Sequence, residues 1–69
     1  SEPYDKEYFK PFFEELNRLD EQSAIYKNTL IDYGYNEETI RALIENQKQK
    51  LMILNRLLTE IQKVNNYEN

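Results

Sequence analysis

The chain has 69 residues, no cysteine and no histidine, and its thirteen acidic and nine basic residues give a net charge of −4. A chain of this length forms one domain and buries a small share of its surface, so we expect self-association or a partner to stabilise it. The acidity argues against binding to nucleic acid or anionic membranes, and the absence of Cys and His excludes disulfides and the usual zinc sites.

The first predicted element is an N-terminal arm of residues 1–9. Pro11 is best placed at the first position of a helix, because inside a longer helix it would lack the N–H that residue 7 needs. Tyr8 and Phe9 then precede the helix. We expect these two residues to form an aromatic surface that binds a partner.

A helix is predicted over residues 11–33. Apolar and polar-aromatic positions follow one another here at alternating steps of three and four, which places them on one helical face. These positions are Phe9, Phe12, Leu16, Leu19, Ser23, Tyr26, Leu30 and Tyr33. Phe13 lies beside this face and is expected to contact a partner.

A turn is predicted over residues 34–36. Gly34 is the only glycine and can end a helix in the left-handed conformation, while Asn36 is a favourable N-cap for a helix that begins with two acids. Tyr35 and Ile40 stand at the positions of a hydrophobic staple. Such a short connection predicts that the two helices lie antiparallel, as a hairpin.

The second helix is predicted over residues 37–65, followed by a tail of residues 66–69. Its apolar sector is wide enough for two heptad rows of side chains. The row expected to pack on the first helix is Ile40, Ile44, Gln47, Leu51, Leu54, Leu58 and Ile61. The row expected to face outward is Leu43, Lys50, Ile53, Leu57 and Val64.

A partner or a second copy is therefore expected to contact the outward row and the residues beside it. The predicted contact residues on the second helix are Met52, Ile53, Leu57 and Val64. In this interpretation Ile53→Asp breaks the outer contact and spares the hairpin, whereas Leu54→Asp unfolds it.

The pairing of the two helices is predicted to join residues whose numbers sum to about 70. Residues 1–38 hold ten acids and four bases, and residues 39–69 hold three acids and five bases, so folding the chain back brings opposite charges together. Ser23 and Gln47 are expected to lie close together as polar positions that fix this register. The predicted charge pairs are Asp20 with Lys50, Glu14 and Glu15 with Arg56, Glu7 with Lys63, and Lys10 with Glu60.

Enzymatic activity is not expected, and neither is a cofactor, a metal or a small-molecule substrate. Carboxylates are the only abundant catalytic type, and their adjacent pairs point about 100° apart on a helix. Their other spacings are typical of solvated helix charge pairs. These spacings occur in Glu14, Arg18 and Glu21 and in Glu38, Arg41 and Glu45.

The sequence thus predicts an all-α, antiparallel two-helix hairpin that resembles a coiled coil and dimerises into a four-helix bundle. The predicted function is a non-catalytic protein–protein interaction module, in the first place a small regulator or inhibitor that binds a larger protein. The alternative is an assembly subunit, either a homo-oligomeric bundle or a coiled-coil segment of a longer protein. A remote alternative is an acidic DNA mimic, because Glu7, Glu14 and Glu21 recur every seven residues.

A cytoplasmic, soluble protein is expected on the same grounds. The sequence has no apolar run approaching the ~20 residues of a membrane span, and no charged segment followed by the apolar core of a signal peptide.

Overall fold

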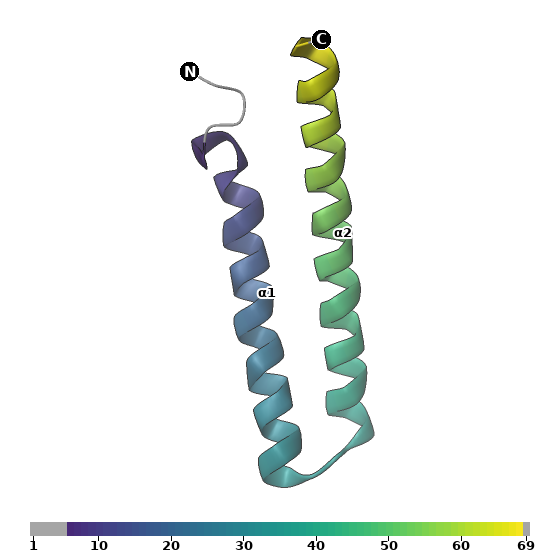
Figure 1. Cartoon of the computed structure of the whole chain (residues 1–69). Coiled ribbons are helices and arrows are strands. Elements are labelled where there is room, and N and C mark those ends of the chain that lie inside the picture. The colour runs from purple at the N-terminus through teal and green to yellow at the C-terminus, as the bar shows by residue number, and fades with distance from the viewer. Residues whose placement is uncertain (1–5, 69) are drawn as a thin grey trace.

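A computed structural model describes the backbone of residues 6–68 and the side chains of residues 7–66. In this part of the chain two helices follow one another, α1 (Lys6–Tyr33) and α2 (Glu37–Glu68). They run antiparallel and pack side by side along their length (Figure 1). The predicted helical hairpin is confirmed, and it is about 52 Å long.

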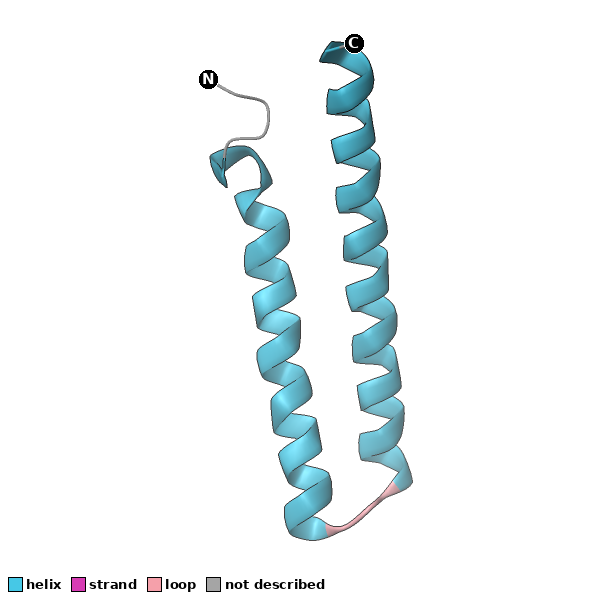
Figure 2. Cartoon of the chain, viewed as in Figure 1, coloured by secondary structure: helices cyan, strands magenta, loops and turns pink. Residues whose placement is uncertain are grey.

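The turn has the structure that the sequence predicts. Gly34 adopts a φ of 98°, and its N–H donates to the Leu30 carbonyl at 3.0 Å, which closes the last turn of α1. The Asn36 side chain accepts a hydrogen bond from the Thr39 N–H at 2.7 Å, as an N-cap does. Residues 34–36 are the only loop between the helices (Figure 2). The expected staple is not formed to any large extent, since Tyr35 is 82% exposed.

The face of α1 that packs on α2 is also the predicted one. Leu19, Ser23 and Leu30 are buried. The other positions of this face up to residue 30 are buried or half-buried, namely Phe9, Phe12, Leu16 and Tyr26. The helix leaves the interface at its end, because Tyr33 is 85% exposed.

The N-terminal part of α1 differs from the prediction. The helix begins at Lys6, with Pro11 inside it, so residues 6–9 are helical and do not form a separate arm. Aromatic packing explains the longer helix: the ring of Phe9 is buried and lies 4.8 Å from the ring of Tyr8 and 6.4 Å from that of Phe12. Residues 1–5 of the expected arm lie outside the described residues.

The end of α2 also extends beyond the prediction, to Glu68 instead of residue 65. No proline or glycine interrupts this segment, and Val64 remains half-buried near its end. The helix therefore continues while one of its faces still has apolar surface to cover.

The pairing of the helices follows the predicted sum of 70 where Lys50 meets Asp20. The Lys50 Nζ donates to the Asp20 carboxylate at 2.5 Å, and this ion pair joins the two helices. Lys63 pairs with Glu60 at 3.2 Å, one turn away on its own helix. The hairpin register is thus confirmed by one of the expected charge pairs.

Candidate protein-interaction surface

Two rows of side chains run along α2, and each row follows the heptad spacing. We call the first the inner seam, whose members are Thr39, Leu43, Asn46, Lys50, Ile53, Leu57, Glu60 and Val64. We call the second the outer seam, whose members are Ile40, Ile44, Gln47, Leu51, Leu54, Leu58 and Ile61. Each outer position up to residue 61 follows an inner position by one residue, so the two seams lie about 100° apart around the helix.

Burial shows which seam faces α1. Every member of the inner seam is buried or half-buried, and every member of the outer seam except Ile61 is exposed. Leu57 of the inner seam is 8% exposed, whereas its neighbour Leu58 of the outer seam is 52% exposed. The inner seam therefore packs on α1, and the outer seam faces away from it.

The sequence-based assignment of the two seams was wrong. It placed the outer seam against α1 because that row repeats the spacing of the first helix, and it turned Ile53, Leu57 and Val64 toward a partner. The structure reverses this assignment. Relative to the prediction, α2 is turned about its own axis by one residue, or about 100°, so that the inner seam faces α1. The predicted effects of Ile53→Asp and Leu54→Asp are reversed as well, because Ile53 is half-buried against α1 and Leu54 is 42% exposed.

Asn46 is the polar residue that holds this rotation. It is 2% exposed, and its side-chain Nδ2 donates to the Leu19 carbonyl at 2.8 Å and to the Gln22 Oε1 at 3.0 Å. The Gln47 Nε2 donates to the Asn46 Oδ1 at 3.1 Å. A buried amide with all its groups bonded specifies one arrangement of the helices, because any rotation leaves it unpaired. Asn46 thus has the role that the sequence assigned to Gln47, which is exposed.

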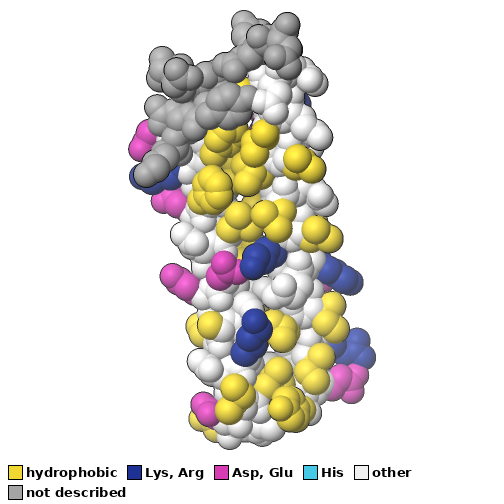
Figure 3. Space-filling model, in the orientation of Figure 1, with side chains coloured by type: hydrophobic (Ala, Val, Ile, Leu, Met, Phe, Trp, Pro, Cys, Tyr) yellow, Lys and Arg dark blue, Asp and Glu magenta, His cyan; other side chains and the backbone are white. Residues whose placement is uncertain are grey.

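The outer seam is the largest row of exposed aliphatic side chains on α2. Five of its members have between 39% and 60% of their surface in water. They are Ile40, Ile44, Leu51, Leu54 and Leu58. Beside them lies an open, mostly apolar groove of about 430 Å³, lined by Leu43, Ile44, Gln47, Lys48 and Leu51. Hydrophobic side chains reach the surface over most of the length of the hairpin, with charged side chains among them (Figure 3).

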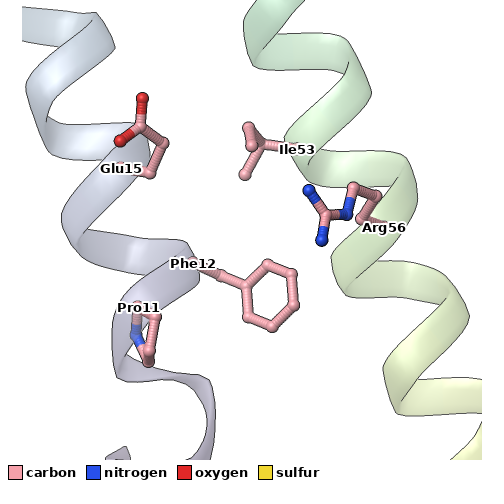
Figure 4. Close-up of a pocket in the computed structure, with 5 residues that line it drawn as sticks. All are labelled: Pro11, Phe12, Glu15, Ile53 and Arg56. Atoms are coloured by element: carbon pink, nitrogen blue, oxygen red, sulfur yellow. The ribbon is translucent and has the colours of Figure 1, made fainter.

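A second groove of about 230 Å³ lies between the two helices. Phe12 of α1 and Ile53 and Arg56 of α2 extend into it, with Pro11 and Glu15 on the α1 side (Figure 4). A neighbouring hollow of about 150 Å³ shares Glu15, Ile53 and Arg56 with it. Glu15 and Arg56 thus line the same groove, in agreement with the predicted proximity of the two.

The carboxylate of Glu15, however, pairs along its own helix. It accepts a hydrogen bond from the Arg18 Nε at 2.9 Å, and this hydrogen bond holds the pKa of Glu15 below its ordinary value. The same contact raises the pKa of Arg18. Arg41 likewise pairs with Glu37 on α2. These are exposed charge pairs one turn apart, and they do not converge on a common point as catalytic carboxylates would.

The residues predicted to contact a partner fall into two groups. Tyr8, Phe13 and Met52 are more than half exposed, so their surfaces are open, and their contact with a partner stays a prediction. The remaining residues are buried or half-buried within the hairpin and are not open to a partner, namely Phe9, Ile53, Leu57 and Val64. The sequence analysis missed the outer seam as an exposed surface. If Asn46 instead of Gln47 is taken as the buried polar position, the same heptad pattern places the outer seam away from α1.

Neither described helix is long and apolar enough to cross a membrane. Within residues 6–68 there is no group of three or more His, Cys, Asp or Glu that could hold a metal ion. Comparison with protein-family models, curated proteins and solved structures found no match for this chain. The surface of the hairpin is therefore the basis for the functional proposal.

Proposed function

We propose that this chain is a non-catalytic protein–protein interaction module that binds through the outer seam of α2. One observation carries the proposal: five aliphatic side chains of one heptad row remain 39% to 60% exposed, while the more polar neighbouring row is buried or half-buried. Contiguous exposed apolar surface on a small protein marks an interaction site. The heptad spacing is the pattern by which one helix packs on another, so the expected partner surface is helical.

The non-catalytic part of this proposal rests on the chemistry of the side chains. The carboxylates of Glu15, Glu37 and Glu60 each pair with a base one turn away on the same helix. Charge pairs of this kind support helices and solubility.

Two forms of the module are consistent with the outer seam. In the first, the chain is a small regulator or inhibitor that lays α2 and the exposed aromatic residues Tyr8 and Phe13 on a larger protein. In the second, the chain is an assembly subunit in which two hairpins form a four-helix bundle, which the unbroken heptad spacing of the outer seam favours. The cytoplasmic location expected from the sequence stays a prediction.

The proposal is tested by immobilising the full chain and identifying what it retains from an extract of its native source. The wild type is compared with Leu54→Asp, which places a charge in the outer seam, and with Met52→Asp. Met52 is exposed but lies outside the outer seam, so the present proposal, unlike the sequence-based prediction, leaves it out of the contact. We expect a partner retained at defined stoichiometry by the wild type and by Met52→Asp, and lost with Leu54→Asp. Equal retention by all three chains would remove the outer seam as the binding surface.

A further inference from the structure

We infer that the outer seam binds the outer seam of a second copy of this chain, with the two α2 helices antiparallel. This inference rests on the proposed function, because it names the occupant of the same surface. Three properties of the outer seam support it: the symmetry of its layers, the charges beside it and its area.

The layers of an antiparallel pair follow from the heptad positions. Such a pair places each a position opposite a d position of the other helix, and here Ile44, Leu51 and Leu58 are the a positions. When paired residue numbers sum to 105, Leu51 lies opposite Leu54 of the second copy, and Ile44 opposite Ile61. Gln47 lies opposite Leu58. Two-fold symmetry repeats each layer, so six of the seven side chains of the row supply both halves of a contact of the same surface with itself, and Ile40 lies opposite Asn65 at the end of this contact.

The charges along α2 favour the antiparallel direction. Residues 37–47 hold three acids and one base, whereas residues 48–68 hold four bases and two acids. An antiparallel pair brings each acidic half beside the basic half of the other copy, and a parallel pair brings like halves together.

The flanking bases also distinguish this antiparallel register from the one at a sum of 98. At a sum of 105, Lys48 lies across from Asn55 and Arg41 from Gln62, so no base meets a base at these flanking positions. The next register, at a sum of 98, would place Lys48 opposite Lys48 of the second copy. Like charges opposite each other are destabilising, so the register at 105 is favoured over the register at 98.

The area of the outer seam, together with the side chains that flank it, lies at the lower limit for a specific dimer. Its five exposed aliphatic residues leave on the order of 450 Å² per chain in water, so two copies bury about 900 Å², and flanking side chains add to this. Specific interfaces begin at about 1,000–1,200 Å². A dissociation constant of about 1–100 μM is therefore expected.

The first test measures the mass of the full chain by sedimentation equilibrium at concentrations from about 1 to 500 μM, a range that brackets the expected affinity. The wild type should change from 8.4 kDa toward twice that mass. Leu51→Asp should weaken dimerisation at least about 100-fold, because each dimer then holds two charges in its central layers. Met52→Asp is the matched control, since Met52 is the next residue and is similarly exposed, at 64% against 60%. It should change the dissociation constant less than about threefold.

The second test measures direction and register with spin labels on single cysteines, which are unique because the chain has no native cysteine. Asn55→Cys and Gln62→Cys occupy the same heptad position one heptad apart, and both side chains are exposed. In the antiparallel dimer at a sum of 105, the two labels at position 55 are offset by about 8 Å along the axis, and those at position 62 by about 28 Å. A parallel dimer has no offset at either position.

Each outcome decides the inference. A short distance at position 55 with a long distance at position 62 supports it, whereas equal distances or a reversed order overturn it. A helical monomer at 500 μM also overturns it, as does equal dimerisation of Leu51→Asp and the wild type. In these last cases the proposed function still stands if Leu54→Asp alone loses a partner from the extract, so the two failures are distinguishable.

Discussion

The inner and outer seams of α2 differ by one residue along the chain and by their surroundings in the fold. The inner seam contains Asn46, Lys50 and Glu60, yet it packs on α1. The outer seam has six aliphatic members and one glutamine, yet it is mostly exposed. The hairpin therefore buries the more polar of two neighbouring rows and leaves the more apolar one exposed.

Specific polar contacts explain the choice of the inner seam. Asn46 is bonded to the backbone of α1, and Lys50 reaches the Asp20 carboxylate while its side chain remains 33% exposed. A seam between only two helices is narrow, so a long charged side chain can bury its stem and keep its charge near water. The more apolar row then remains available to a second helix. Its burial there contributes more favourable free energy than burial of the more polar row would, because more apolar area leaves water.

The largest effect is expected from moving one charge between the two seams. Leu57→Asp should destabilise the hairpin by more than about 3 kcal/mol, because it buries a carboxylate in the contact with α1. Leu58→Asp should change the stability of the monomer by less than about 1 kcal/mol, since Leu58 is 52% exposed. Urea unfolding followed by circular dichroism measures both variants at about 0.5 and 5 μM, and equal results at the two concentrations show that dimers do not contribute.

This pair of variants is a direct check on the rotation of α2. Both change the same residue type to the same charge at consecutive positions, so helix propensity and net charge are matched. If Leu58→Asp unfolds the hairpin and Leu57→Asp does not, the outer seam is the one that packs on α1.

The second effect concerns the buried amide of the inner seam. Asn46→Ala removes the hydrogen bonds to the Leu19 carbonyl and to Gln22, so we expect a loss of about 1–2 kcal/mol in the free energy of unfolding. Gln47→Ala, at the neighbouring exposed position, should cost less than about 0.5 kcal/mol. Equal losses at the two positions would mean that Asn46 has no special role.

Replacing Asn46 should also weaken the preference of α2 for packing its inner seam on α1. Cysteines placed at positions 57 and 58 should react with a soluble thiol reagent slowly and rapidly, respectively. When Asn46→Leu is added, these two rates should approach each other, because an apolar residue no longer excludes the rotated arrangement. Unchanged rates would assign the choice of seam to the turn and to the Asp20–Lys50 pair.

Local structure was predictable from the sequence where a residue type strongly favours one conformation or one environment. Gly34 and Asn36 identified the turn, and the positions from Phe12 to Leu30 identified the buried face of α1. The pair of Asp20 and Lys50 followed from the shortness of the turn, because a short connection leaves little choice of register along the helix axis.

The rotation of α2 was not predictable in the same way. Two heptad rows one residue apart satisfy the same periodicity, and hydrophobicity favours the wrong one. The decision lies in tertiary contacts of Asn46 with Leu19 and Gln22, 27 and 24 residues away along the chain. The helical start at Lys6 was missed for a similar reason: Pro11 argues locally against it, and the burial of Phe9 outweighs that argument.

A smaller effect is expected at the turn that joins the helices and precedes both seams. Gly34→Ala should cost about 1 kcal/mol, because a φ of 98° is unfavourable for a residue with a Cβ. The cost is confined to the backbone, since a Cβ at this position meets nothing within 4 Å. Gly34→Asn should cost less than Gly34→Ala, because Asn tolerates positive φ better.

The measurement is again urea unfolding, with thiol reaction rates at positions 57 and 58 as the second readout. Because Asn46 and Lys50 hold the rotation of α2, the variants at Gly34 should lower stability without exchanging the buried and exposed positions. An exchange of the two rates in Gly34→Ala would instead show that the turn selects the inner seam.

The smallest effect is expected from the exposed pair of Glu15 and Arg18. Its contribution to stability can be compared with that of side chains packed in the inner seam. The hydrogen bond from Arg18 lowers the pKa of Glu15 in the folded chain below its ordinary value of 4.5. A lowered folded pKa means that the pair stabilises the fold above pH 4.5, where the carboxylate is charged in both states. That contribution is lost as the pH falls through the lowered pKa, because protonation then favours the unfolded chain.

A double-mutant cycle with Glu15→Gln, Arg18→Gln and the double variant isolates this contribution from every other titrating group. The coupling free energy between the two positions should be small and constant from pH 7 to pH 5, and should decline toward zero below pH 4.5. The loss from Leu57→Asp should exceed the coupling at every pH, since it reflects burial against α1. A coupling that persists well below pH 4.5 would mean that the ionised carboxylate of Glu15 is not responsible for the interaction with Arg18. The pair would then not measure the contribution of surface charge.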